Sequence, residues 1–303
     1  LREPMNAMEI FNWSLFSALA LAGLAVATAY FKSYSIIQPP KRRTPVLFHP
    51  DQYNLAHETI DFTTADGLTL KGWFIPAVDG ATDKTIIICH GWGANRGDLL
   101  RDTHFLAEKG FNLFYFDFRA SGQSGGAVSS VGYLETRDFD AAYNFLKTHR
   151  PHAMERAAVF GRSMGGSVAI FAAAKYPEFK CVLAESTFLS YRRVIANWSW
   201  MRAKVPYFPM VAMTLAFVKF KLGVDPEPFS PAQNVDKLKM PVLFICGDRD
   251  DLVPLHDEET LYGLCGSPKK QLWIITGASH AKCAEVGGEI YKTRVTQFFT
   301  ENL

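Results

Sequence analysis

Residues 157–175 read AAVFGRSMGGSVAIFAAAK, and this stretch decides the fold. A short apolar run, Ala157–Phe160, ends in Gly-Arg-Ser-Met-Gly, and a segment of helical composition, Ser163–Lys175, follows at once. A strand that passes into a helix through small residues predicts a sharp turn that raises the Ser163 hydroxyl above the edge of a sheet. The alternative is an ordinary glycine-rich turn with a solvated serine, and the decision depends on partners elsewhere in the chain.

Strand and helix patterns alternate through most of the sequence. Strands are expected at Glu58–Thr63, Leu68–Ile75, Thr85–Cys89, Phe111–Phe116, Ala157–Phe160, Cys181–Ala184, Val242–Cys246 and Leu272–Ile275. Helices are expected at Gly97–Lys109, Tyr133–Thr148, Ser163–Lys175, Leu255–Leu264 and Glu285–Thr300. This alternation predicts an α/β fold with a mostly parallel central sheet and helices on both faces. The turn signal Ala65-Asp66-Gly67 adds an antiparallel start.

The composition excludes several function classes. The chain has 303 residues, of which 48% are hydrophobic, enough for a large core. A net charge of +2 gives no electrostatic reason to expect a nucleic-acid partner. The five cysteines form no disulfide framework and no C-x-x-C motif, so we expect reduced thiols and no metal site.

The N-terminal region differs from the rest of the chain. Ile10–Phe31 carries no charged residue over 22 positions. As a helix it would be about 33 Å long, enough to cross a bilayer core of about 30 Å. We therefore expect a tail at residues 1–9, a transmembrane anchor at 10–31 and a linker at 32–57.

The flanks of this apolar stretch bear on its orientation. Lys32 and Lys41-Arg42-Arg43 lie on its C-terminal side, which favours a cytoplasmic position for the domain that follows. A cleaved signal peptide is the alternative, with Ala27-Thr28-Ala29 as a small-residue cleavage site. The positively charged segment that normally precedes the apolar part of a signal peptide is missing, so a retained anchor is favoured.

An insertion at about 187–235 interrupts the alternation of strands and helices. Helices are expected there at Ser190–Trp200 and Val211–Leu222, and no acidic residue occurs between Ser186 and Val224. A basic, aromatic cap is typical of a segment that lies on a membrane surface or over a lipid-like substrate. The alternative is an ordinary cap with solvated charges. Its candidate substrate contacts are Phe188, Tyr191 and Trp198.

A nucleophilic serine needs a base, and the base needs an acid that holds its tautomer. Three acids, Asp248, Asp250 and Asp251, follow the apolar run Val242–Cys246, and His280 follows the last expected strand. The carboxyl ends of parallel strands meet at one edge of a sheet, so we expect one of these acids, His280 and Ser163 to come together.

Another glycine-rich turn, His90-Gly91-Trp92-Gly93, follows the expected strand Thr85–Cys89. The backbone N–H groups of Trp92 and Met164 are the expected donors to a substrate oxyanion. Gly91 and Gly93 would let the chain approach a substrate closely. They and His90 are substrate-contact candidates, although a structural role is the favoured interpretation for His90.

These motifs together resemble the α/β-hydrolase superfamily of serine hydrolases, over residues 58–303. The resemblance rests on HGWG (90–93), FDFRASGQS (116–124), GRSMG (161–165), GDRDDLVP (247–254) and GASH (277–280). It is greatest to single-pass or peripheral Bem46-like members with a short cap. Their G-x-x-D-x-x-V-P pattern selects Asp250 as the acid and leaves Asp251 as the fallback. Ala120 departs from the Arg-Gly common in the family.

The resemblance implies a membrane-anchored serine hydrolase that cleaves a small-molecule or lipid carboxylic ester through an acyl-enzyme, without a cofactor. Phospholipase, lysophospholipase, thioesterase and peptidase activities stay open, because members of the superfamily differ in substrate. A binding protein of the same fold without activity is a further alternative.

One competing interpretation is a short-chain dehydrogenase. Gly91-x-Gly93-x-x-x-Gly97 follows an expected strand, Asp117 ends the next one, and Tyr143-x-x-x-Lys147 offers a Tyr/Lys pair. In that family several βα units separate the glycine loop from the pair, whereas about one does here. This interpretation also gives no role to Ser163 or His280, so the hydrolase is favoured.

Overall fold

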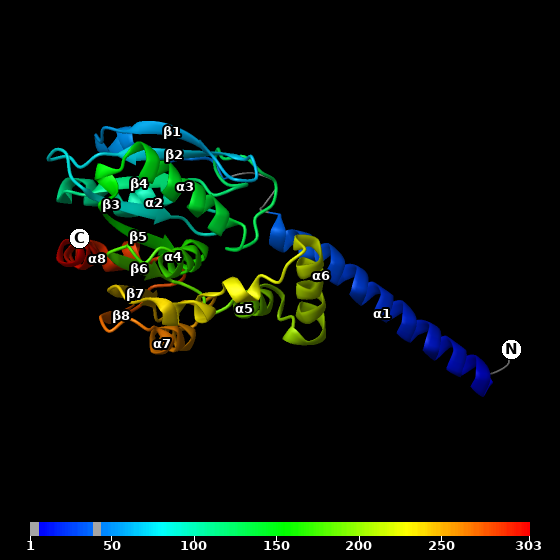
Figure 1. Ribbon diagram of the computed structural model, residues 1–303. Helices are drawn as coiled ribbons and strands as arrows, with labels where there is room; N and C mark the ends of the chain where they lie inside the picture. Colours follow the sequence, from blue (N-terminus) through cyan, green and yellow to red (C-terminus); the bar gives the residue numbers. More distant parts are fainter. Residues whose placement is uncertain (1–5, 39–43) are drawn as a thin grey trace.

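An eight-stranded sheet forms the centre of the molecule in the computed structural model, which describes residues 6–38 and 44–303 (Figure 1). The strands lie in the order β1-β2-β4-β3-β5-β6-β7-β8. They are β1 (Glu58–Thr63), β2 (Thr69–Ile75), β3 (Lys84–Cys89), β4 (Asn112–Phe116), β5 (Arg156–Arg162), β6 (Cys181–Glu185), β7 (Val242–Gly247) and β8 (Lys270–Ile275). Residues 1–5 of the expected tail and the Lys41-Arg42-Arg43 charges lie outside the described residues.

The strand directions follow from the connections between the strands. β1 and β2 form an antiparallel hairpin, and β2 pairs antiparallel with β4. From β4 to β8 every neighbouring pair is parallel, so the carboxyl ends of these strands meet at one edge. The predicted α/β fold, with its mostly parallel sheet and antiparallel start, is confirmed.

Helices cover both faces of the sheet. They are α2 (Arg96–Thr103), α3 (Glu135–His149), α4 (Met164–Lys175), α7 (Leu255–Leu264) and α8 (Cys283–Asn302). Buried side chains of α3, α4 and α7 form one apolar core, represented by Phe139, Val168 and Leu261. Those of α2 and α8 form a second core with the opposite side chains of the strands, because successive residues of a strand face opposite sides.

The helix expected at Gly97–Lys109 is divided in two. α2 ends at Thr103, whose backbone leaves the helical region, and a 3-10 segment continues over His104–Lys109. The Thr103 hydroxyl lies within hydrogen-bond distance of the Leu99 carbonyl oxygen (2.6 Å) and the Tyr115 hydroxyl (2.8 Å). A buried hydroxyl that needs partners therefore helps to fix the break, which helical periodicity does not reveal.

The cap lies between β6 and β7. It contains α5 (Tyr191–Ala203), a π-helical turn at Tyr207–Val211, α6 (Ala212–Leu222) and three 3-10 turns at Glu227–Phe229, Pro231–Gln233 and Val235–Lys237. Several of its large apolar side chains are exposed, among them Phe208 and Phe220. The cap stands beside the carboxyl edge of the sheet and contacts the N-terminal helix (Figure 1).

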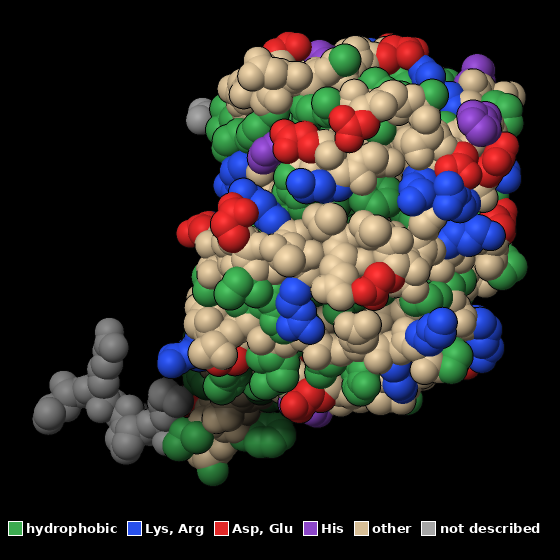
Figure 2. All heavy atoms as spheres, turned by 90° about the vertical axis from the view of Figure 1, so that its left-hand side faces the viewer, with side chains coloured by type: hydrophobic (Ala, Val, Ile, Leu, Met, Phe, Trp, Pro, Cys, Tyr) green, Lys and Arg blue, Asp and Glu red, His purple; other side chains and the backbone are tan. Residues whose placement is uncertain are grey.

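The N-terminal helix α1 (Ala7–Ile37) projects from the domain (Figure 1). It is longer than the predicted anchor, since it continues through Ser33 to a last turn that packs on the cap. Within the described residues it is the one unbroken helix long and apolar enough to cross a membrane, and its most apolar window is unburied. The face of the molecule remote from α1 carries interspersed acidic and basic side chains, as expected of a surface in contact with water (Figure 2).

Candidate active site

Ser163 occupies the turn between β5 and α4. Its backbone lies at φ 54° and ψ −117°, a conformation that is costly for any residue with a side chain. Two glycines make the turn possible. A Cβ atom on Gly161 would lie 2.2 Å from the Gly165 carbonyl oxygen, and one on Gly165 would lie 2.0 Å from the Cys89 carbonyl oxygen. Glycine is thus required at both positions because the backbone segments of this turn lie so close together. The turn leaves the serine hydroxyl at the edge of the sheet.

The structure brings Ser163, His280 and Asp250 together. His280 Nε2 is 3.0 Å from Ser163 Oγ, and His280 Nδ1 is 2.7 Å from Asp250 Oδ2. With Nδ1–H donating to the carboxylate, Nε2 is free to accept the serine proton. These distances fit a nucleophile, its base and the acid that orients the base.

The geometry distinguishes Asp250 from its neighbours. Its side chain is 1% exposed, and its Oδ1 accepts hydrogen bonds from the backbone N–H groups of Leu252 (3.0 Å) and Val253 (2.8 Å). Asp248 is exposed and accepts from Gly277 N instead (2.6 Å), and Asp251 is exposed. Asp250, and not the fallback Asp251, is the acid that contacts His280.

The expected oxyanion donors lie at the same site. Trp92 and Met164 line one pocket with Ser163 and His280. Met164 is the first residue of α4, so its N–H has no acceptor within the helix. Among the backbone contacts of the described residues, the Trp92 N–H also has no partner. Two unpaired amides beside the serine match the requirement for donors to a developing oxyanion.

A largely apolar cavity of about 250 Å³ adjoins the serine. Its lining comes from the sheet edge, the cap and the last turn of α1: Ser35, Ile36, Trp92, Val131, Ser163, Met164, Phe188, Val194, Ile195, Trp198, Arg202, Leu252 and His280. Of the predicted cap contacts, Phe188 and Trp198 therefore reach the pocket. Tyr191 does not, because it faces the interior between the cap and the main domain and is 4% exposed.

The substrate-contact candidates at residues 90, 91 and 93 lie outside the pocket lining, and for His90 this agrees with the structural role favoured from the sequence. His90 is 1% exposed; its Nδ1 lies 2.7 Å from the Gly91 carbonyl oxygen, and its Nε2 accepts from Phe118 N at 3.0 Å. Burial lowers the pKa of His90 and so favours the neutral ring that these two contacts require. Gly91 and Gly93 shape the turn that carries Trp92, but neither lines the pocket.

Sequence reasoning missed several lining residues. Ser35 and Ile36 come from the helix predicted only to be an anchor, and Val131 comes from the loop before α3. No local pattern marks them, because their position depends on contacts between segments far apart in the chain. The described residues include no cluster of three or more His, Cys, Asp or Glu side chains that could hold a metal ion.

Comparison with known proteins agrees with this geometry. The family model described as serine aminopeptidase, S33, matches residues 80–227. The Bacillus subtilis (strain 168) protein YqkD is 30% identical over 239 residues, which cover 78% of this chain and 76% of YqkD. Protein bem46 of Schizosaccharomyces pombe is 25% identical over 301 residues, which cover 97% and 94% of the two chains.

A solved structure shares both fold and sequence with the chain. It is an esterase of Pyrococcus furiosus, with a TM-score of 0.75 and 30% identity, covering 88% of this chain and 98% of the esterase. The elbow serine, the parallel sheet and these similarities lead to one family. The chain belongs to the α/β-hydrolase superfamily and is a relative of the Bem46-like proteins within it.

Proposed function

We propose that this protein is a membrane-anchored serine hydrolase that cleaves carboxylic esters. The observation that carries the proposal is the hydrogen-bonded series Ser163–His280–Asp250 at an apolar pocket with two unpaired backbone amides. Covalent catalysis by serine requires these parts: a nucleophile, a base with a fixed tautomer, oxyanion donors and a water-poor space for the acyl group.

The reaction proceeds in two steps. Ser163 Oγ attacks the ester carbonyl carbon while its proton passes to His280 Nε2, and the amides of Trp92 and Met164 stabilise the oxyanion. The tetrahedral intermediate collapses, and His280 gives the proton to the departing alcohol. A water molecule then attacks the acyl-enzyme, again losing a proton to His280, which returns it to Ser163 as the carboxylic acid leaves.

The lining of the pocket favours an ester over a peptide with a free amino terminus. An aminopeptidase must bind a positively charged amine, whose usual partner is a carboxylate. None of the described residues that line the pocket is Asp or Glu. The lining is mainly apolar, as an acyl group requires. The similarity to an esterase of known structure supports the same choice.

Membrane attachment is the second part of the proposal. α1 has 31 residues and is about 46 Å long, more than the roughly 30 Å of a bilayer core. Its exposed side chains include Phe11, Leu19 and Leu24, each more than 60% exposed, which is unfavourable in water. The basic segment at Lys41-Arg42-Arg43 favours a cytoplasmic catalytic domain.

A second candidate activity is hydrolysis of an acyl lipid with an anionic headgroup, such as a lysophospholipid. Arg202 lines the pocket, and its guanidinium lies 5.7 Å from the ring centroid of Trp198. A guanidinium binds phosphate oxygens by charge-assisted hydrogen bonds. Arg202→Gln should therefore lower kcat/KM for lysophosphatidylglycerol more than for an uncharged monoacylglycerol. Equal effects on both lipids would exclude this role of Arg202.

The test of ester hydrolysis uses the full chain in detergent. Wild type should turn over p-nitrophenyl esters and react with a fluorophosphonate probe, and Ser163→Ala and His280→Ala should each abolish turnover with the fold retained by circular dichroism. His256→Ala is the matched control, because His256 is exposed and outside the pocket. Equal probe labelling of wild type and Ser163→Ala would overturn the proposal.

A further inference from the structure

The last turn of α1 forms part of the substrate pocket. Ser35 and Ile36 line the cavity together with Ser163 and His280, although more than 120 residues separate them from the serine in the chain. Ile36 is 5% exposed and belongs to the same apolar cluster as Met164 and Phe188. The helix that would cross the membrane therefore also contributes a wall to the active site.

The cap holds this part of α1 through polar and aromatic contacts. Lys221 of α6 donates from Nζ to the Tyr30 carbonyl oxygen (2.9 Å) and to Ser33 Oγ (2.5 Å). The ring of Tyr30 meets that of Phe217 edge to face, with centroids 5.4 Å apart. These contacts fix the end of the helix relative to α6, so Ser35 and Ile36 have a defined place in the pocket.

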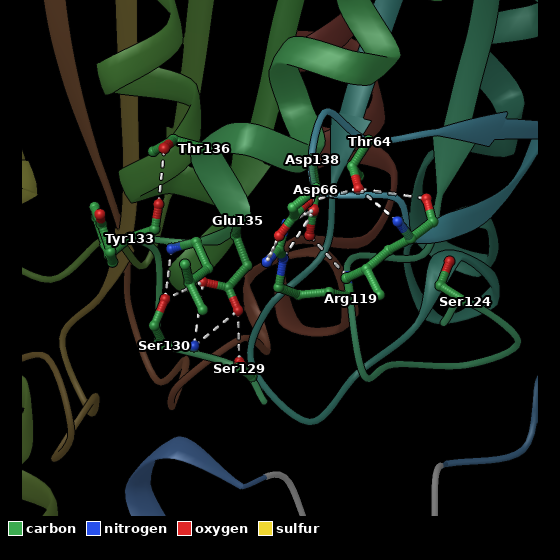
Figure 3. A network of polar contacts seen from close by, with 12 residues as sticks. Thr64, Asp66, Arg119, Ser124, Ser129, Ser130, Tyr133, Glu135, Thr136 and Asp138 are labelled. Carbon is green, nitrogen blue, oxygen red and sulfur yellow. Dashed lines mark hydrogen bonds and ion pairs between the residues drawn. The ribbon is translucent and has the colours of Figure 1, made fainter. Parts of the chain in front are cut away.

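A clamped loop holds the end of the same helix from another side. The backbone N–H of Ser129 donates to the Ile37 carbonyl oxygen at 2.8 Å. The loop is held in turn by the buried carboxylate of Glu135, which accepts from Ser129 Oγ (2.7 Å), Ser130 N (3.0 Å), Ser130 Oγ (2.9 Å) and Gly132 N (2.9 Å) (Figure 3). A carboxylate with this many donors makes a rigid loop.

Val131 lies inside this clamp and lines the pocket. Its φ of 54° is rare for a β-branched residue and is kept only where the surroundings determine it. The Glu135 contacts to Ser130 and Gly132 hold the backbone on both sides of Val131. The strained backbone therefore lies at the residue whose apolar side chain faces the pocket. The same loop binds the end of α1.

The surroundings of this wall indicate how a substrate would arrive. α1 continues away from the pocket with exposed apolar side chains such as Phe31, which is 69% exposed. The cap adds Phe208 and Phe220, at 78% and 79% exposed. Exposed apolar side chains on α1 and on the cap, the two segments that contribute to the pocket, suit an amphiphile that stays in the membrane. At about 250 Å³ the cavity is below the roughly 300–1,000 Å³ typical of ligand pockets, which favours one acyl chain.

We propose that the last turn of α1 selects the acyl group, with Ser35 and Ile36 as specificity-determining residues, and that the substrate is an ester of a single-chain membrane amphiphile. This inference rests on the proposed ester hydrolysis at Ser163. α1 is then both a membrane anchor and a wall of the active site. A different membrane helix in its place would restore the anchoring but not the shape of the pocket.

The test compares two equal substitutions on one helix. Ser35→Trp narrows the pocket at an exposed position, so kcat/KM for a dodecanoyl ester should fall about tenfold or more, while the acetyl ester changes by less than about twofold. Ser17→Trp is the control, because residue 17 lies on the same face of α1, five turns or about 27 Å away. It should leave both substrates at wild-type rates.

A second variant keeps the proposal testable if the tryptophan disturbs the fold. Ile36→Ala widens the pocket and should shift the optimum of an ester series from C2 to C16 toward longer chains. An unchanged chain-length profile in either folded variant would overturn the role of α1. Absence of Ser163-dependent hydrolysis in wild type would instead overturn the proposed function, so the two failures are distinguishable.

Discussion

The edge of the sheet and the segments that cover it are built in different ways. At the edge, Ser163, Asp250 and His280 stand on loops that follow parallel strands, and buried backbone groups hold the first two. The cover consists of the cap and the end of α1, which meet through side chains and leave large apolar groups such as Phe220 exposed. Under the proposed function, the edge carries out the reaction and the cover determines which substrate enters.

The difference shows that the two regions depend on different physical requirements. Substitution at the edge acts on atoms that must stay within hydrogen-bond distance, so a small change has a large effect. Substitution in the cover changes the apolar area that is in contact with other groups or with solvent. The effect on activity or stability is then proportional to that area. Substitutions at the edge should therefore have the largest effects.

Asp250→Asn should have the largest effect. The amide would keep the volume of the side chain but remove the charge and favour the wrong histidine tautomer, so kcat should fall about 10⁴-fold. Asp251→Asn is the matched control, since the neighbouring acid is exposed and does not contact His280. Steady-state kinetics on a p-nitrophenyl ester measure both. A large loss in Asp251→Asn with little in Asp250→Asn would reverse the assignment of the acid.

The sequence was sufficient to predict the structure where a local pattern of residues determines the backbone geometry. The bounds of β1 were predicted to the residue, α7 was placed correctly, and the elbow was recognised because Gly161 and Gly165 are sterically required there. The order of serine, acid and histidine was enough to bring the three groups to one edge, since parallel strands place their carboxyl ends together.

The sequence was insufficient where the position of a side chain depends on a distant segment. Tyr191 and Trp198 lie seven residues apart on one helix, yet only Trp198 reaches the pocket. Ser35 lines the site because α6 and the loop at Ser129 bind the end of α1, and no local periodicity encodes that contact. The buried contacts of His90 agree with the structural role favoured from the sequence, because a glycine-rich turn also needs buried polar groups that support it.

Glu258 offers a test of the interior just behind the edge. It is fully buried on α7, and burial together with the charges of Asp250 and Asp257 raises the pKa of its carboxyl well above the ordinary value of 4.5. Between these two values the folded chain keeps a proton that the unfolded chain has lost. The free energy of unfolding should therefore fall as pH rises above about 4.5, by about 1.4 kcal/mol per pH unit from this group.

Glu258→Gln removes that dependence. The variant should gain stability over wild type as pH increases from 5 to 8, measured by urea unfolding in detergent. Exposed Glu259→Gln is the control and should show a difference from wild type that does not change with pH. A stability difference between Glu258→Gln and wild type that is constant over this range would contradict a protonated carboxyl in the folded chain.

Phe220→Asp tests the cover. Phe220 is 79% exposed on α6, and a carboxylate there should weaken contact with the bilayer. We expect kcat/KM on a vesicle-embedded long-chain ester to fall about tenfold, close to 1.4 kcal/mol, while a soluble acetyl ester is unaffected. Ile290→Asp is the matched control, because Ile290 is 67% exposed on α8, outside the cap. Equal losses from both variants would show that α6 has no special contact with lipid.

Ala120→Gly should have the smallest effect, and it returns to the backbone of the edge. Ala120 follows β4 with φ 55°, where a left-handed conformation costs a non-glycine residue about 1–2 kcal/mol. Glycine relieves this strain but gives back about 0.4–1 kcal/mol in unfolded-chain entropy, and it also loses a buried methyl group. The free energy of unfolding should change by less than about 1 kcal/mol.

Ala142→Gly, at a buried helical position in α3, is the control and should lose at least about 1 kcal/mol of stability. If both variants lost the same stability in thermal unfolding, the positive φ of Ala120 would carry no energetic cost that glycine relieves, and alanine would be the stabilising residue at this turn.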